Sequence, residues 1–461
     1  MSTSAEIPAY ERRWWILAAV GIGTFMSALD GSVVNTVLPL IRTSMHTSVA
    51  GVEWVTTMYL LAVSALLLGV GRAGDLRGHK VIYLTGFALF ALGSALCGLA
   101  PSIHILVGMR VLQGVGAAMV FANGPAILTK SFPTEQRGRA LGAQATFTYL
   151  GLTAGPSLGG WLATVLGWRS VFYINVPVGI VAIVLGLRVI EEDHPSEKSE
   201  EFDTAGAFLF GLGLVALLVA LNQGHAWGWH SAPTLIFLGI AAILLVYFLI
   251  YERRRTSPML DLSLFRSRVF SAATLSALLN YICVYSVLFV IPFLLIQGRH
   301  LTAAHTGFVL SAQPLIMAIA APISGNLSDR IGSRTPATLG MLILAGGLAV
   351  LAYLANTGSL LHMAAALAVV GLGVGIFVSP NNSALMGAAP RARQGIAAGV
   401  LATARNVGMV LGVGISAAVL MTVMAHSTGE AVLGLVKGAQ ASLLVAAVAA
   451  LLGAGVAFVR E

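Results

Sequence analysis

The segment GRAGDLRGHK at residues 71–80 and the segment GNLSDRIGSR at residues 325–334 are variants of one decapeptide. Four chemically matched positions recur at one constant displacement, and these are Gly71, Asp75, Gly78 and Lys80 in the first segment and Gly325, Asp329, Gly332 and Arg334 in the second. The chain has only 18 acidic residues in 461, so such a match is improbable by chance. The repeat predicts two related halves, an organisation that many membrane folds share.

The composition around both decapeptides is that of an integral, all-α membrane protein. Hydrophobic residues make up 57% of the chain and charged residues 10%, whereas a soluble domain carries about 25% charged residues. The mean hydropathy is +0.89, and apolar stretches of about 20 residues, each long enough to cross a bilayer as a helix, recur along the chain. About fourteen such spans are expected, at Trp14–Leu38, Val52–Val70, Val81–Ala100, His104–Leu128, Ala140–Val165, Val171–Ile190, Thr204–Asn222, Pro233–Tyr251, Val269–Ile296, Thr306–Asn326, Thr335–Ala355, Leu360–Pro380, Ile396–Met424 and Gly438–Val459.

Lysine and arginine concentrate in alternate loops between these spans, which places both termini in the cytoplasm by the positive-inside rule. The acidic stretch Glu191–Asp203 is then a cytoplasmic linker. If each half holds six helices, Thr204–Tyr251 supplies two extra helices at the join. We therefore expect an N-terminal six-helix bundle at 1–190, the linker with the extra helices and a basic loop at 191–268, and a C-terminal six-helix bundle at 269–461.

Several function classes are disfavoured by what the sequence lacks. The two cysteines, Cys97 and Cys283, lie far apart in apolar segments, so neither a metal site nor a disulfide framework is expected. The net charge of +8 is scattered over short loops, and topology explains it better than nucleic-acid binding does. No GxxxxGK[ST] loop for ATP and no HExxH sequence within a span occur, which argues against an ATP-driven pump and a membrane enzyme. A receptor or a channel remains a further alternative.

Asp30 is the only acidic residue well inside a predicted span. An intramembrane carboxylate is costly unless it is paired or hydrated, and it is a functional hypothesis by default. At 1.5 Å per helical residue, Asp30 and Arg110 lie about 13 Å and about 9 Å below the outer ends of their spans, so they can share a layer. Such a pair suits proton coupling, although a purely structural ion pair is the alternative. Arg405, beside Asn406, is similarly deep and can bind a neighbouring helix, line a cavity or extend toward the inner interface.

The two decapeptides are similar to the loop motif between the second and third helices of the major facilitator superfamily and to its second-half copy. The resemblance implies that family's fold, with two pseudo-symmetric six-helix bundles and, here, two extra central helices. It also implies that the loops gate the cytoplasmic side through contacts that hold one conformation and break in the other. The loop residues to which it assigns this gating role are Gly71, Asp75, Arg77, Gly78, Lys80, Asp329 and Arg330. Loop rigidity alone is the other explanation.

Further stretches resemble helix motifs of the fourteen-helix drug:proton antiporter family. LDGSVVNTVLP at residues 29–39 is similar to the first-helix signature, with Ser32 where threonine is usual and Leu38 where alanine is common. The fourth-helix motif of proton-coupled members is matched by Arg110, Gln113, Gly114 and Gly116. GLTAGPSLGG at residues 151–160 is similar to the fifth-helix antiporter motif, and its expected conformational residues are Gly151, Gly155, Pro156, Gly159 and Gly160. Glycines permit close helix contact and proline favours a bend, although close packing alone also explains the motif. WRSVFYINVP at residues 168–177 is another family-like stretch.

The resemblance implies a secondary antiporter that exports lipophilic small molecules in exchange for protons, with Asp30 and Arg110 coupling the proton. Candidate cargo contacts are polar or aromatic side chains on spans expected to line a central cavity, and these are Asn35, Gln113, Tyr149, Asn280, Tyr281, Tyr285, Gln313, Asn382, Arg405 and Asn406. An interhelical hydrogen bond is an alternative role for each of them. The lack of a second intramembrane acid argues against dicationic cargo. Export of a lipid or a secreted metabolite fits equally well, and proton symport is the less favoured alternative.

The expected partners are membrane lipid, protons and a small lipophilic substrate, with the proton gradient as the energy source. No cofactor, metal or nucleic acid is expected, and the protein is predicted to be a monomer. The resemblance places it in a bacterial inner membrane as a multi-pass protein.

Overall fold

The protein is described here from a computed structural model that covers residues 9–47, 49–192, 202–255, 258–301, 303–426 and 431–459. Within these ranges the regular elements are all helical. The long helices are α1 (Ala9–Ser44), α2 (Val49–Arg77), α3 (His79–Leu99), α4 (Ile103–Ser131), α5 (Arg137–Leu166), α7 (Asn175–Val189), α8 (Thr204–Trp227), α9 (Ala232–Glu252), α10 (Arg268–Phe293), α11 (Ala303–Ile331), α12 (Arg334–Thr357), α13 (Leu360–Ala388), α14 (Gln394–His426) and α15 (Ala431–Val459). The short elements are η1 (Thr134–Gln136), α6 (Ser170–Tyr173), η2 (Leu262–Arg266), η3 (Leu294–Gly298) and η4 (Arg391–Arg393).

The predicted all-α, multi-span architecture is confirmed. In the described part of the chain, 13 helices are long and apolar enough to cross a membrane. Helix α5, with 30 residues, is as long as these helices, but only its stretch Ser157–Leu166 is markedly apolar. Its polar residues include Gln144 and Thr148, which face a central cavity rather than lipid.

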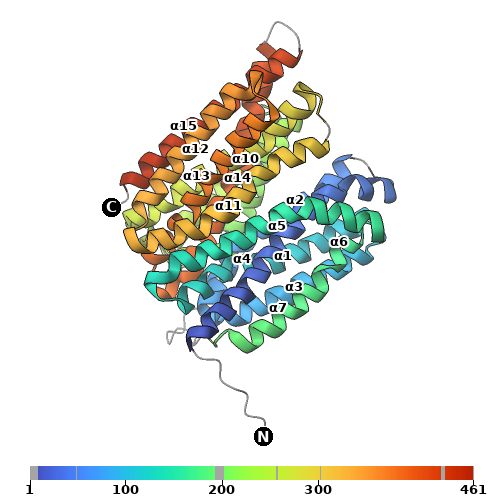
Figure 1. Ribbon diagram of the computed structural model, residues 1–461. Coiled ribbons are helices and arrows are strands. Elements are labelled where there is room, and N and C mark those ends of the chain that lie inside the picture. The colour runs from blue at the N-terminus through green and yellow to red at the C-terminus, as the bar shows by residue number, and fades with distance from the viewer. Residues whose placement is uncertain are drawn as a thin grey trace.

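The long helices form two groups and an added pair (Figure 1). In the first half α1 packs on α5 and α4 packs on both α2 and α3, and in the second half α13 packs on both α11 and α12 while α10 packs on α14 and α15. The halves meet where α5 lies against α11 and α2 lies against α14. Helix α8 packs on α9 and also touches α2 and α14, so the added pair covers one of these two seams.

The internal repeat extends into helix packing. Gly86 of α3 and Gly116 of α4 face each other, because a Cβ atom built on Gly116 would lie 2.6 Å from the Gly86 carbonyl oxygen. Gly340 of α12 and Gly373 of α13 repeat this contact in the second half, with a Cβ on Gly373 at 2.7 Å from the Gly340 oxygen. Small residues let helices approach closely within lipid, where no hydrophobic force drives them together. Gly86 and Gly340 are separated by the same displacement as the two decapeptides.

The sixth predicted span, Val171–Ile190, corresponds to one apolar stretch long enough to cross the membrane, Ser170–Val189. Its helical hydrogen-bond pattern is interrupted at Ile174, between α6 and α7, although Ile174 keeps a helical backbone conformation. Proline has no backbone N–H, so Pro177 cannot donate to the carbonyl oxygen of Tyr173 as a helical residue at that position otherwise would. Asn175 lies at this interruption and is 1% exposed.

Candidate functional site

Asp30 lies at the centre of a buried polar cluster between α1, α4 and α7. Its Oδ2 accepts a hydrogen bond from a terminal guanidinium nitrogen of Arg110 at 2.6 Å, so the two residues form an ion pair. Its Oδ1 accepts hydrogen bonds from Gln113 Nε2 and from Asn175 Nδ2, each at 2.9 Å. Both side chains of the ion pair are fully buried. Asp30 therefore has three side-chain donors, two of them neutral and one charged.

Arg110 also has contacts other than its ion pair with Asp30. Its Nε donates to the carbonyl oxygen of Val55 at 3.1 Å, and the nitrogen that contacts Asp30 also donates to Gln113 Oε1 at 2.7 Å. The guanidinium lies 4.1 Å from the ring centroid of Tyr59, within the range of a cation–π contact. A buried ion pair is stable only when the remaining donors and acceptors are also satisfied, and these contacts satisfy most of them.

The sequence anticipated part of this cluster and missed the rest. The depth argument brought Asp30 and Arg110 to one layer, and the structure pairs them. Gln113 was expected to contact cargo, but its side chain donates to Asp30 and accepts from Arg110. Asn175 was not anticipated as a site residue, although it lies in the WRSVFYINVP stretch two residues before a helix-breaking proline.

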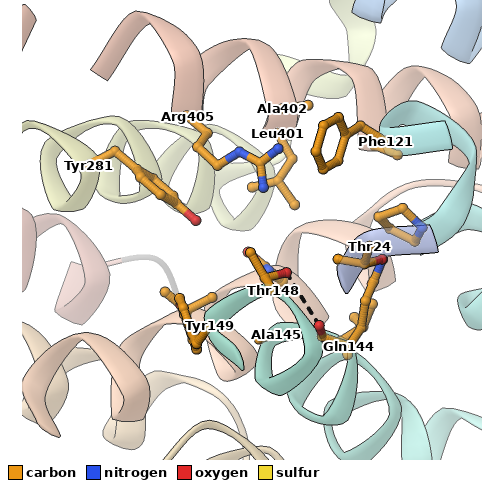
Figure 2. Close-up of a pocket in the computed structure, with 15 residues that line it drawn as sticks. Thr24, Phe121, Gln144, Ala145, Thr148, Tyr149, Tyr281, Leu401, Ala402 and Arg405 are labelled. Carbon is orange, nitrogen blue, oxygen red and sulfur yellow. Dashed lines mark hydrogen bonds between the residues drawn. The ribbon is translucent and has the colours of Figure 1, made fainter. Parts of the chain in front are cut away.

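A central cavity lies between the two halves (Figure 2). Its lining includes Thr24 of α1 and Phe121 of α4, the helices that carry Asp30 and Arg110. It has a free volume of about 60 Å³, enough for a few water molecules but much less than the roughly 300 Å³ or more of a drug-binding pocket. The lining residues are Thr24, Phe121, Pro125, Leu141, Gln144, Ala145, Thr148, Tyr149, Tyr281, Val378, Asn382, Ala398, Leu401, Ala402 and Arg405. They come from helices of both halves, so a rearrangement of the halves would resize the cavity.

Four predicted cargo contacts line this cavity, and they are Tyr149, Tyr281, Asn382 and Arg405. The other predicted cargo contacts do not line the cavity. Asn35 is exposed, and its Oδ1 accepts a hydrogen bond from Thr56, whereas Asn280 donates to the sulfur of Met341 on α12. The cavity lining also lacks Gln313, Tyr285 and Asn406. The structure adds Thr24, Phe121, Gln144 and Thr148, which the sequence did not single out. Gln144 Nε2 donates to Thr24 Oγ1 at 3.2 Å and so bridges α5 and α1 across the edge of the cavity.

Asp75 joins the two halves at the end of the molecule that holds the decapeptides. Its Oδ1 accepts from the backbone N–H of Gly395 at 2.8 Å and its Oδ2 from that of Ile396 at 3.0 Å. Both N–H groups belong to the first turn of α14, where unpaired N–H groups and the helix dipole favour a carboxylate. Gly71 of α2 lies directly against Gly395, with no room for a side chain at either position.

Asp329 makes the matching contact between α11 and α5. It accepts from the backbone N–H of Gly138 at 2.8 Å and from that of Arg139 at 2.9 Å, in the first turn of α5. Gly325 lies against Gly138 as Gly71 lies against Gly395. We call these two sets of contacts the α2–α14 latch (Gly71, Asp75, Gly395, Ile396) and the α11–α5 latch (Gly325, Asp329, Gly138, Arg139). Both sets of contacts join the two halves at the side that the positive-inside rule assigns to the cytoplasm.

The other loop residues with a predicted gating role have looser contacts. Gly78 has a φ of 93°, which favours glycine and ends α2 sharply. Lys80 donates to the carbonyl oxygen of Leu187 on α7 at 3.4 Å. Arg77 and Arg330 are exposed.

The fifth-helix motif lies against α1. A Cβ on Gly151 would come within 2.5 Å of the Phe25 carbonyl oxygen, and one on Gly155 would overlap the Ser32 hydroxyl. A Cβ on Gly159 would lie 3.2 Å from the Val33 carbonyl oxygen, which is closer than an ordinary contact, whereas Gly160 has open space around it. Pro156 lies within α5, and its side chain is outside the described part.

Comparison with known proteins gives a consistent result. The family model described as Major Facilitator Superfamily matches residues 20–413. The riboflavin transporter RibZ of Clostridioides difficile is 34% identical over 403 residues, covering 87% of this chain and 87% of RibZ. The multidrug resistance protein Stp of Mycobacterium tuberculosis (strain H37Rv) is 35% identical over 405 residues, covering 88% of this chain and 75% of Stp. Among solved structures, the human organic anion transporter MFSD10 has a TM-score of 0.70 at 15% identity over 96% of this chain and 99% of MFSD10, which is a likeness of fold.

Proposed function

The chain belongs to the Major Facilitator Superfamily, and we propose that it is a proton-coupled antiporter that exports lipophilic small molecules by alternating access. The protein is a multi-pass transporter of the bacterial inner membrane, in a family of transporters rather than enzymes, with drug-resistance proteins among its relatives. The proposal concerns its coupling to protons, the direction of transport and the class of cargo.

The observation that carries the proton-coupling proposal is the set of contacts around Asp30. The carboxylate is buried, is paired with Arg110 and is held by two amide donors, Gln113 and Asn175. Protonation would cancel the charge that holds the guanidinium, and at least one donor would lose its acceptor. A carboxyl group placed in this way can exist in two arrangements with different helix contacts, which a proton-driven conformational change requires.

Cargo would bind in the central cavity and share two helices with the proton site. Thr24 lies six residues from Asp30 on α1, which corresponds to about 9 Å along the helix. Phe121 lines the cavity from α4, the helix that carries Arg110. A shift of α1 against α4 on protonation therefore alters the cavity wall without any further connecting element.

The domain division at 1–190, 191–268 and 269–461 is proposed as the mechanical basis of this cycle. The two bundles would rock about the cavity while the latches at Asp75 and Asp329 form and break. The Gly151–Gly160 motif supports export over uptake only through its family resemblance.

The test uses purified protein in liposomes with an imposed pH gradient. Internal pH is followed while lipophilic cations, neutral drugs and aromatic acids are added one at a time. Proton movement that requires one cargo and is lost in Asp30→Asn is the expected result. Glu191→Gln serves as the matched control, because this carboxylate is 69% exposed at the membrane surface. Cargo flux that is indifferent to the gradient and to Asp30→Asn would refute proton antiport.

The match to RibZ supports a second candidate cargo, a planar metabolite such as riboflavin. The same liposomes test it: riboflavin-dependent proton movement that exceeds the response to every drug in the panel would favour metabolite transport over multidrug export.

A further inference from the structure

Arg405 places a positive charge on the wall of the central cavity. Its side chain extends from α14 between the rings of Phe121 and Tyr281, with Thr148, Tyr149 and Gln144 across the cavity (Figure 2). The guanidinium carbon lies 5.2 Å from the Phe121 ring centroid and 5.9 Å from that of Tyr281. Arg405 Nε has no hydrogen-bond partner in the described part of the chain.

Among the described residues, no acidic side chain balances the charge of Arg405. None of the described carboxylates lies within ion-pair distance of it, and the residues that line the cavity include no aspartate or glutamate. Asp30, the acid inside a span, is already neutralised by Arg110. A cationic side chain within the membrane normally pairs with an acidic side chain or extends to the interface. The Arg405 guanidinium is therefore able to bind an anionic ligand.

Two further features of the cavity suit an anion attached to an aromatic body. The Tyr149 hydroxyl, on a side chain only 4% exposed, has no hydrogen-bond partner among the described residues and can donate to an acidic group. Phe121 and Tyr281 flank the guanidinium and line the cavity, so aromatic surface lies beside the positive charge. Guanidinium groups bind carboxylates through two parallel donors, a geometry that lysine cannot reproduce.

We propose that the cargo is a small aromatic organic anion that binds once a movement of the two halves has enlarged the cavity of about 60 Å³, with its acidic group on Arg405 and Tyr149 and its rings on Tyr281 and Phe121. The inference rests on the proposed function in one respect, namely that this cavity is the cargo site. It names a substrate class opposite in charge to lipophilic cations, which Arg405 would repel.

The experiment uses three compounds with one ring system and different charge: 1-naphthaleneacetate, 1-naphthaleneacetamide and 1-naphthylmethylammonium. Binding to the protein in phosphatidylcholine nanodiscs is measured by calorimetry, with no pH gradient. A charge-assisted hydrogen bond predicts that the acetate binds about tenfold or more tightly than the amide. The ammonium compound should bind weakest of the three.

Three variants assign this preference to Arg405. Arg405→Gln should abolish the advantage of the acetate over the amide, and Arg405→Lys should retain part of it, because the charge remains without the planar fork. Arg268→Gln is the matched control, since this arginine is exposed at the start of α10. Retained binding of the amide by Arg405→Gln shows that the variant is folded.

An acetate that binds no better than the amide, or that does not bind measurably, would overturn the inference. So would displacement of the acetate by phosphatidylglycerol in the discs, because it would assign the charge to a lipid headgroup. These results are independent of proton coupling. A cation exchanged for protons through Asp30, unaffected by Arg405→Gln, would refute the anion inference and leave the antiport proposal intact. Anion binding without Asp30-dependent proton movement would do the reverse.

Discussion

Asp75→Asn should open the cytoplasmic side by weakening the α2–α14 latch. In the structure both carboxylate oxygens of Asp75 accept from backbone N–H groups, at 2.8 Å from Gly395 and 3.0 Å from Ile396. A hydrogen bond to a charged group contributes about 1.5–3 kcal/mol, and the first turn of a helix adds about 0.3–1 kcal/mol for a negative charge. Asparagine keeps one neutral acceptor and loses the other hydrogen bond and the charge, so the net loss is roughly 2–4 kcal/mol, which shifts the closed-to-open ratio by about 30- to 900-fold.

Spin labels on the two latch-side turns can measure this shift. Thr134 and Ala392 are exposed and precede α5 and α14, one in each half. Cys97 and Cys283 are buried, so labels added to Thr134→Cys and Ala392→Cys attach selectively. Pulsed dipolar spectroscopy in nanodiscs should show a longer distance population in Asp75→Asn than in the parent protein.

The second latch provides an internal check on this reasoning. Asp329→Asn should act in the same direction but more weakly, because Asp329 is half-buried whereas Asp75 is buried. The two changes act on one equilibrium from separate sites, so their free energies should add in the double variant. Glu191→Gln should leave the distances unchanged. Unaltered distances in both single variants and in the double variant would refute the view that the two aspartates hold the halves closed.

Two further predictions concern the fifth-helix motif and the cargo charge. Gly155→Ala should lower the thermal stability and the transport rate, since its Cβ would overlap Ser32 and overpacking costs about 1–3 kcal/mol. Gly160 has open space around it, so Gly160→Ala should resemble the parent protein in both assays. If the cargo is a monovalent anion exchanged for one proton, each cycle moves two charges, worth about 4.6 kcal/mol at 100 mV. Currents on a solid-supported membrane should then accompany 1-naphthaleneacetate transport, and electroneutral exchange would contradict this expectation.

The fold was largely predictable from the sequence because the membrane imposes simple rules. Apolar length alone located the helices, since a spanning segment must satisfy its own backbone hydrogen bonds. The interruption of the helix between α6 and α7 was not predicted, although Pro177 indicates it, because hydropathy does not register the loss of a single hydrogen bond. Asn175 lies at this interruption and donates to Asp30, and for the same reason it was not predicted as a site residue.

The sites were predictable where charge decided them and not where helix rotation did. The pairing of Asp30 with Arg110 could be predicted from their depth in the membrane, because few charged residues lie inside predicted spans and such residues usually form ion pairs. Asn280 looked equally suited to a cavity, but a modest rotation of α10 turns it to Met341. Neither neighbour of Asp75 across the latch was predicted, since Gly395 lies 320 residues further along the chain. The sequence does contain a sign of these partners, because the similar stretches PTEQRG at 133–138 and PRARQG at 390–395 lie at the starts of α5 and α14.

The arrangement of charges explains why proton and cargo would influence each other without touching. Arg110 is held by Asp30 and by the Val55 carbonyl of α2. The loss of the Asp30 charge would therefore break the ion pair between α1 and α4, leaving the Gln113 contact between these helices and the Val55 contact between α4 and α2. Helix α2 carries the Asp75 latch at its far end and packs on α14, the helix of Arg405. Under the proposed mechanism, a proton on Asp30 would change the contacts of α1, and α1 also contributes Thr24 to the cavity that Arg405 faces. Coupling through shared helices would require only that each helix move as a rigid body, so one buried carboxyl group would be enough for the proposed cycle.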